Sequence, residues 1–201
     1  QETDAGWRAE LPSGWAQGRA VFGGLATAMA VALGQRNVED DWVLRTLNVQ
    51  FPRPTTPGLV AGRFEVLRAG KGTLFAEVRL EQGDATVLVT QLIFVRPRAG
   101  GVEVDAAPFR GARPPGELAD MPYLPGVTPE FTQHFAFRWA TGGFPFSGQP
   151  TATLTGYCRL RVPFGDVEGM LGLIDGWPCP TLSMLTRPTM ASSVMWTVHL
   201  I

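Results

Sequence analysis

Hydrophobic and polar residues follow one pattern near the start of the chain and another pattern after it. Residues 18–36, "GRAVFGGLATAMAVALGQR", are almost all small or apolar and contain no proline. The run ends at Gly34, Gln35 and Arg36, followed by Asn37, which is a composition typical of a helix C-terminus. The pattern therefore predicts one buried helix in the first half of the chain.

After this helix the hydrophobic residues recur at every second position, which is the period of a strand with one buried face. Pro-rich and Gly-rich turn signals separate these segments from one another. A helix followed by consecutive strands predicts an α+β unit whose antiparallel sheet wraps the helix on one face. The predicted strands cover residues 42–51, 59–70, 73–82 and 86–95.

The second half of the chain repeats this order of elements. "PFGDVEGMLGLIDGWP", at residues 163–178, has the Phe-Gly start and the helix-length apolar run of "VFGGLATAMAVALGQ". The strand-like "SSVMWTVHLI" that comes after it mirrors "LRTLNVQFP", which follows the first helix. We therefore expect an internal repeat in which each copy is a small domain. Two further strands are predicted at residues 131–140 and 153–162.

Residues 98–129 separate the two copies and are rich in Pro, Gly and Ala with little periodicity, as expected for a linker. The predicted units are thus residues 1–97 and 130–201. If the copies match, the second should continue with further strands, yet the sequence stops at Ile201. A truncated chain, strands supplied by a partner, or a mistaken repeat would each explain this. An incomplete sheet would expose an edge, which is costly.

Composition excludes several classes of function. The 201 residues carry a formal net charge of −1 and no long Lys/Arg run, which argues against a nucleic-acid surface and against binding to anionic membranes. The longest apolar run, Leu25 to Leu33, is too short to cross a bilayer. Cys158 and Cys179 lack metal-ligand spacing, so we expect free thiols, no metal and a cytoplasmic location.

Several segments together resemble a known family. "FGGLATAMAVAL", "LNVQFPRPTTPG", "VLRAGKG" and "TQLIFVRP" are similar to the first half of acyl-CoA thioesterase II (TesB-type) proteins, and "LGLIDGWPCP" with "SSVMWTVHL" is similar to the second half. The resemblance implies a double hotdog, in which each of two fused units holds a long helix in a curved antiparallel sheet. It also implies hydrolysis of acyl-CoA at the seam without a cofactor, by a monomer or a homodimer of fused chains.

The family's catalytic residues are a carboxylate, a hydroxyl residue and a glutamine. The resemblance places the carboxylate at Asp175 in "LIDGWP" and the hydroxyl at Ser193, with Ser192 as the neighbouring alternative. The family usually has threonine at the hydroxyl position. The strand that would carry the glutamine lies beyond Ile201, and Gln91 occupies the comparable position of the first half.

The residues around Asp175 are consistent with a catalytic base. Asp175 is the only acidic residue of "MLGLIDGW", and burial there would raise its pKa toward the working pH. The alternative is that it ends its helix before Gly176 and Pro178. Ser192 and Ser193 are equally well explained as ordinary polar residues at the start of a strand.

Gly23 and Gly24 lie at the start of the first helix, where free N–H groups and the helix dipole favour an oxyanion. Close packing of the helix is the alternative explanation. The sequence has no Gly-rich nucleotide-binding signature, which excludes a phosphate loop. Arg68 and Lys71 in "VLRAGKG" could meet the phosphates of coenzyme A, although exposed turn cations often have no specific role.

Three functions remain in competition. Hydrolysis of acyl-CoA leads, and a catalytically silent acyl-CoA-binding module is kept open by the serine and the unplaced glutamine. A hotdog hydratase or dehydratase is less favoured because His134 and His199 are predicted on strands, away from both helices. An α/β-hydrolase is disfavoured because there is no Gly-x-Ser-x-Gly motif. The acyl tunnel would be lined by core residues of the two helices, Met29, Met170, Leu171 and Leu173.

Overall fold

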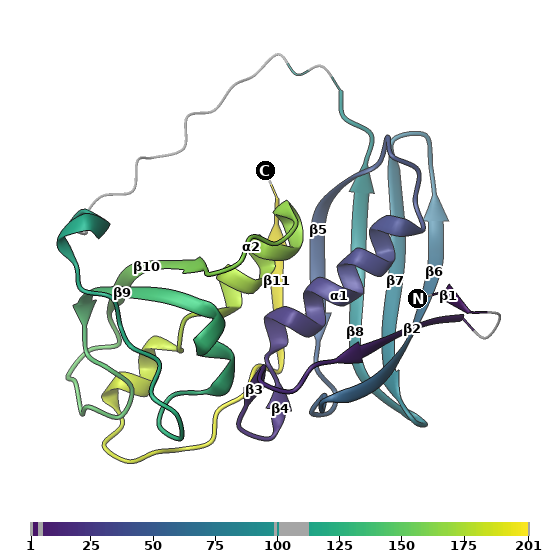
Figure 1. The fold of residues 1–201 in the computed structure, drawn as a ribbon. Coiled ribbons are helices and arrows are strands. Elements are labelled where there is room, and N and C mark those ends of the chain that lie inside the picture. The colour runs from purple at the N-terminus through teal and green to yellow at the C-terminus, as the bar shows by residue number, and fades with distance from the viewer. Residues whose placement is uncertain (1, 4–5, 99, 101–112, 201) are drawn as a thin grey trace.

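A computed structural model gives the fold of the chain and describes residues 2–3, 6–98, 100 and 113–200. A large sheet covers the first helix on one side (Figure 1). The second helix lies beside the first, and a smaller pair of strands lies beyond it. This arrangement is the predicted α+β double hotdog.

The first unit forms as its hydrophobic pattern predicts. Helix α1 (Gly23–Arg36) lies against the sheet, and Gly34 allows close approach because a Cβ there would collide with Leu92. Along β7 (Thr73–Gln82) buried and more exposed side chains alternate, so that one face covers α1. The other predicted strands appear as β5 (Val43–Gln50), β6 (Gly58–Ala69) and β8 (Ala85–Val95).

The segment before α1 contains strands that the sequence pattern did not predict. Strand β2 (Gly6–Leu11) pairs antiparallel with β6, and β3 (Ala16–Gln17) and β4 (Ala20–Val21) form a small hairpin. Strand β1 (Glu2–Thr3) pairs with β2. Most of these strands are too short for a repeating pattern of hydrophobic residues to reveal them.

The second unit has the predicted order of elements with one correction. Residues predicted to begin a strand at Phe131 instead form the 3₁₀ helix η2 (Glu130–His134), which is stabilised locally because Thr132 Oγ1 donates to the Pro129 carbonyl. The strand starts only at Phe135. The remaining elements are β9 (Phe135–Gly142), β10 (Leu154–Leu160), α2 (Asp166–Asp175), η3 (Pro180–Met184) and β11 (Met195–His199).

The two units share one sheet and one helix contact. Strand β11 pairs antiparallel with β5, which gives a seven-stranded sheet in the order β1-β2-β6-β7-β8-β5-β11. The segments "LRTLNVQFP" and "SSVMWTVHLI", which mirror one another in the sequence, are therefore partners at the seam. Helices α1 and α2 meet at Gly24 and Gly172, where a Cβ on Gly24 would lie 3.1 Å from the Gly172 Cα. Strands β9 and β10 pair separately.

Aromatic rings fill the seam next to the start of α1. The ring of Phe22, which precedes α1, stacks on Phe131 with centroids 4.2 Å apart, and Phe135 meets both rings edge-on. Phe22, Phe131 and Phe135 are all buried. This cluster fixes the N-terminus of α1 against the second unit.

The described part of the predicted linker packs on the second unit. Arg138 on β9 pairs with Asp120 and donates a hydrogen bond to the Pro115 carbonyl of η1 (Pro115–Glu117). The N–H of Met121 also donates to the Phe137 carbonyl. Residues 101–112 of the predicted linker lie outside the described residues. Neither of the described α-helices is long and apolar enough to span a membrane.

Candidate active site at the seam between the two units

Asp175 brings a carboxylate of the second unit to the helix of the first. It is the last residue of α2, and the backbone N–H of Gly24 donates a hydrogen bond to its side chain. A Cβ added to Gly23 would lie 2.9 Å from the Asp175 Oδ2. The carboxylate therefore sits at the N-terminus of α1, where the helix dipole and the free N–H groups favour negative charge.

Burial changes the protonation of this carboxyl group. Removal of water raises the pKa of Asp175 from 3.8 to about 6, although the hydrogen bond from Gly24 acts in the opposite direction. No charged residue that the structure describes contributes to this shift. The group is thus ionised for the most part at pH 7, and it can still take up a proton there.

Phe51, directly after β5, approaches the same point next to Gly23 as the carboxylate. Its Cζ is 3.2 Å from the point where a Gly23 Cβ would be, the point that Asp175 Oδ2 also approaches. The Phe51 N–H donates to the Val194 carbonyl over 2.9 Å, which brings residues 192–194 of the second unit to this end of α1. The sequence did not single out Phe51, although it lies within the mirrored segment that forms the seam.

The two candidate serines lie in this 192–194 segment and are exposed. Within β11, Trp196 and Val198 are more buried than Met195, Thr197 and His199, so alternate side chains face opposite sides. This alternation ends with the strand, because residues 192–194 lie outside β11 and Val194, two residues before Trp196, is exposed. The bond from Phe51 to Val194 brings the segment to this end of α1, and the structure does not distinguish Ser192 from Ser193.

Gln91 is not brought together with Asp175. It lies on β8 with Asn48 and Glu77 as its cross-strand neighbours, and its side chain is exposed. Its chain neighbours Thr90 and Leu92 are buried on the face that covers α1. Gln91 therefore points to the outer face of the sheet, away from α1.

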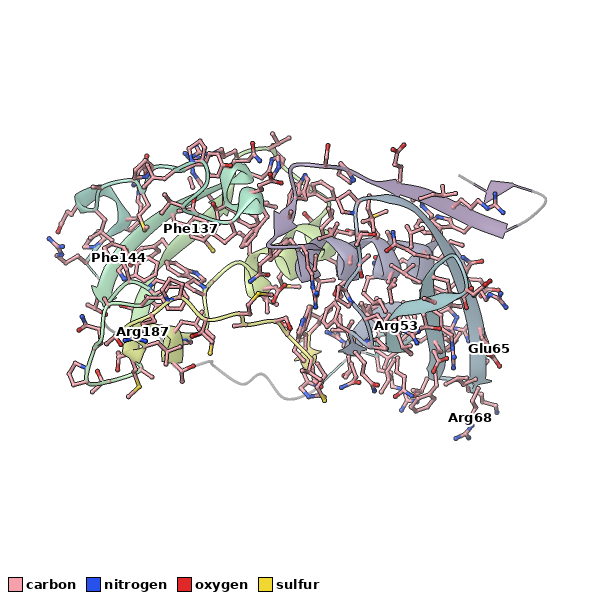
Figure 2. The ribbon with its side chains drawn as sticks, turned by 90° about the horizontal axis from the view of Figure 1, so that it is seen from below. Arg53, Glu65, Arg68, Phe137, Phe144 and Arg187 are labelled. Carbon is pink, nitrogen blue, oxygen red and sulfur yellow. The ribbon has the colours of Figure 1, made fainter. Side chains whose placement is uncertain are left out.

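Arg68 and Lys71 lie at the other end of the first unit. The Lys71 carbonyl accepts a hydrogen bond from Arg96, whose guanidinium also pairs with Asp41 just after α1. Asp175 lies at the start of α1, which is the opposite end of the helix. Because a helix of 14 residues is about 21 Å long, Arg68 and Lys71 lie far from the Asp175 carboxylate. Arg68 extends into solvent at the end of the molecule away from Phe144 of the second unit (Figure 2).

The two histidines have other partners. The His134 ring stacks on Trp15 with centroids 4.0 Å apart, and its Nε2 lies 3.0 Å from the Gly14 carbonyl oxygen. His199 Nδ1 lies 3.1 Å from Thr46 Oγ1 on the outer face of the sheet. In residues 2–3, 6–98, 100 and 113–200 no group of His, Cys, Asp and Glu side chains is arranged to hold a metal ion.

An open hollow of about 410 Å³ borders the C-terminal end of α2. Ile174 and Trp177, which flank Asp175 in the sequence, line it together with Leu154 and Cys179. None of the residues predicted to line an acyl tunnel does so. Leu171 is completely buried and Met29 and Leu173 are partly buried, so these three belong to the core of the seam.

Family comparison agrees with this two-unit organisation. The model of the acyl-CoA thioesterase N-terminal domain matches residues 11–95, and the model of the acyl-CoA thioesterase C-terminal domain matches residues 115–201. The second match begins within the segment predicted as a linker, residues 98–129. Comparison with curated proteins gives no match.

Solved structures support the fold. A protein of unknown function with a hot dog fold from Alicyclobacillus acidocaldarius is 17% identical with a TM-score of 0.83, over 96% of this chain and 72% of its own. A candidate thioesterase II from Thermobifida fusca YX is 21% identical with a TM-score of 0.79, over 96% and 74%. Acyl-CoA thioesterase II TesB2 from Mycobacterium marinum is 18% identical with a TM-score of 0.61, over 84% and 61%.

Proposed function

Because the chain belongs to the acyl-CoA thioesterase family, we propose that it hydrolyses acyl-CoA thioesters to a carboxylic acid and coenzyme A. We further propose that Asp175 is the general base. The observation that carries this assignment is the Asp175 carboxylate, partly removed from water at the N-terminus of α1 with its pKa raised to about 6. A base with a pKa just below the working pH is ionised and still accepts a proton readily.

In the first step Asp175 takes a proton from a water molecule while the water oxygen attacks the thioester carbonyl carbon. The carbonyl oxygen becomes an oxyanion, which needs a hydrogen-bond donor. The Gly24 N–H already donates to Asp175, whereas the N–H of Gly23, in the same first turn, has no intrahelical acceptor. We assign the oxyanion to the Gly23 N–H and the orientation of the base to the Gly24 N–H.

In the second step the tetrahedral intermediate collapses and its carbon–sulfur bond breaks. The electron pair of this bond leaves with the sulfur of coenzyme A as a thiolate, which takes the proton held by Asp175. The products are the acid and the free thiol, and Asp175 returns to its ionised form. This route uses one carboxylate for both proton transfers and needs no covalent intermediate.

A hydroxyl group from the 192–194 segment would orient the attacking water. Because the family resemblance places the hydroxyl at Ser193, we expect Ser193→Ala to lower kcat more than Ser192→Ala, by about 10-fold against less than 2-fold. Release of free thiol from an acyl-CoA at saturating substrate measures both variants. Equal loss in the two variants, or a larger loss in Ser192→Ala, would contradict the assignment.

The raised pKa of Asp175 predicts the pH dependence of hydrolysis. Below pH 6 kcat/KM should fall about tenfold for each pH unit, because the base becomes protonated, and above pH 7 it should level off. A pH series of initial rates with one acyl-CoA measures the midpoint, expected at about 6. A midpoint near 4, the ordinary value for aspartate, would mean that the base is solvated or is a different residue.

A panel of acyl-CoA thioesters tests the function itself. Time-dependent release of coenzyme A thiol from at least one member supports hydrolysis. Tight binding of an acyl-CoA without release would favour a silent binding module. Hydration of an enoyl-CoA without thiol release would favour a hydratase, and either of these outcomes would overturn the proposal.

A further inference from the structure

We propose that Phe51 is a positioning residue for Asp175: its ring, supplied by the first unit, keeps water from one side of the carboxylate. The inference rests on the proposed function only where it concerns catalysis, because the shielding itself is a physical property of the folded chain. Figure 1 shows the C-terminal end of β5 next to the start of α1, which is where the two units meet.

The ring and the carboxylate converge on one place. Above Gly23, the position of a hypothetical Cβ lies 3.2 Å from Phe51 Cζ, 3.5 Å from Phe51 Cε1 and 2.9 Å from Asp175 Oδ2. The carboxylate and the aromatic ring therefore border the same point above the first turn of α1. Phe51 is itself partly buried and packs against the hydrophobic core, so its ring is not a mobile surface group.

The backbone of Phe51 fixes the position of this ring. The regular pairing of β5 with β11 ends at Gln50 and Met195, and the bond from the Phe51 N–H to the Val194 carbonyl adds one further step. Pro52 follows and has no N–H, so the backbone cannot donate again at the next residue. Phe51 is thus the last donor of this strand edge, held by the segment that carries the candidate serines.

Desolvation is the main influence on the carboxyl group at this place. The first turn of α1 carries no acidic residue, and Gly23 and Gly24 have no side chain to titrate. Asp166 and Glu168 lie at the opposite end of α2, and Arg53, two residues after Phe51, is exposed. None of these charged groups contributes to the pKa of Asp175. Removing the ring should therefore act by readmitting water and by little else.

Two variants with a matched control test the inference. Carbon-13 NMR of the aspartate carboxyl groups, with the Asp175 signal assigned from Asp175→Asn, measures the pKa directly. We expect Phe51→Ala to lower it by about 1 and Phe51→Leu, which keeps apolar bulk, to lower it less. Phe64→Ala removes a partly buried ring from β6, away from Asp175, and should leave the pKa unchanged.

The outcomes separate this inference from the proposed function. An unchanged Asp175 pKa in folded Phe51→Leu and Phe51→Ala would overturn the shielding role. Should Phe51→Ala fail to fold, Phe51→Leu alone decides, because a pKa equal to that of the wild type would refute the role. A lowered pKa in a protein that cleaves no acyl-CoA would support the shielding and refute the catalysis. If hydrolysis occurs, the acid limb of kcat/KM should move to lower pH together with the NMR value.

Discussion

Asp175→Asn is expected to lower kcat for acyl-CoA hydrolysis by about 10²-fold to 10⁴-fold, the usual contribution of a general base. The asparagine has almost the same shape as the aspartate, and its side-chain oxygen can still accept the Gly24 N–H. It cannot take a proton from water at any working pH. The substitution thus removes the chemistry and keeps the packing at the seam.

The same substitution should stabilise the fold at neutral pH. The pKa of Asp175 is about 6 in the folded chain against 3.8 for the ordinary group, so the folded state holds the proton more tightly. The stability that this group contributes therefore falls as the pH rises from about 4 to about 6. At pH 7 the cost is about 2–3 kcal/mol before allowance for the water that still reaches a half-buried side chain, so we expect a gain of about 1–2 kcal/mol in Asp175→Asn.

Urea unfolding at pH 7 and pH 4 measures this gain, which should largely disappear at the lower pH. Asp166→Asn is the control, because Asp166 is an exposed acid at the other end of α2. It should leave kcat unchanged. Wild-type kcat in Asp175→Asn would exclude Asp175 as the base, and equal stability at pH 7 would mean that its carboxylate is well solvated.

The order of elements could be predicted from the sequence because it depends on local patterns. Alternating hydrophobic residues between Gly and Pro turns predict β7 at its observed bounds and β5, β6 and β8 to within a residue or two at each end. Strand β9 was predicted too early, because local backbone hydrogen bonds such as that from the Thr132 N–H to the Pro129 carbonyl make η2 from residues 130–134, and hydrophobic periodicity does not register them. The two-residue strands before α1 have no period at all.

The site could be predicted only in part, because it depends on contacts between distant segments. The apolar surroundings of Asp175 suggest a raised pKa, but its bond with Gly24 follows from helix packing that one sequence does not specify. For Gln91 the sequence could not predict the side of the sheet on which its side chain lies. Apolar residues occupy both faces of β8, so the pattern does not reveal which face covers α1. The position of the Phe51 ring likewise depends on the pairing of β5 with β11, two strands that are far apart in the sequence.

The glycine pair at the start of α1 gives the second large effect. A Cβ on Gly24 would lie 2.6 Å from the Phe22 ring, which is fully buried, and 3.1 Å from the backbone of Gly172. The Phe22 ring is held by Phe131 and Phe135, and the Gly172 backbone belongs to α2, so Gly24→Ala should lose about 1–3 kcal/mol of stability. A loss of this size lowers the melting temperature by about 2–10 °C in a chain of this length.

Gly23→Ala should separate activity from stability. Its added Cβ would lie 2.9 Å from Asp175 Oδ2, the end of a side chain, and 3.2 Å from Phe51 Cζ, so both side chains must shift by a small amount. We expect a smaller loss of melting temperature than in Gly24→Ala and a fall in kcat of about 10-fold to 100-fold, since the base loses its place beside the oxyanion donor. Thermal unfolding and thiol release, measured on the same preparations, give both numbers.

Gly172→Ala is the control for both glycines because it lies across the same helix contact with the opposite expectation. A Cβ at Gly172 meets no atom within 4 Å, and alanine is the better helix former, so this variant should be as stable as the wild type or more stable by up to about 1 kcal/mol. If Gly172→Ala destabilises the chain as much as Gly24→Ala, the helices require two glycines for close approach. If Gly24→Ala is harmless, the contact does not hold the units together, and the position of Asp175 must depend on β5 and β11 instead.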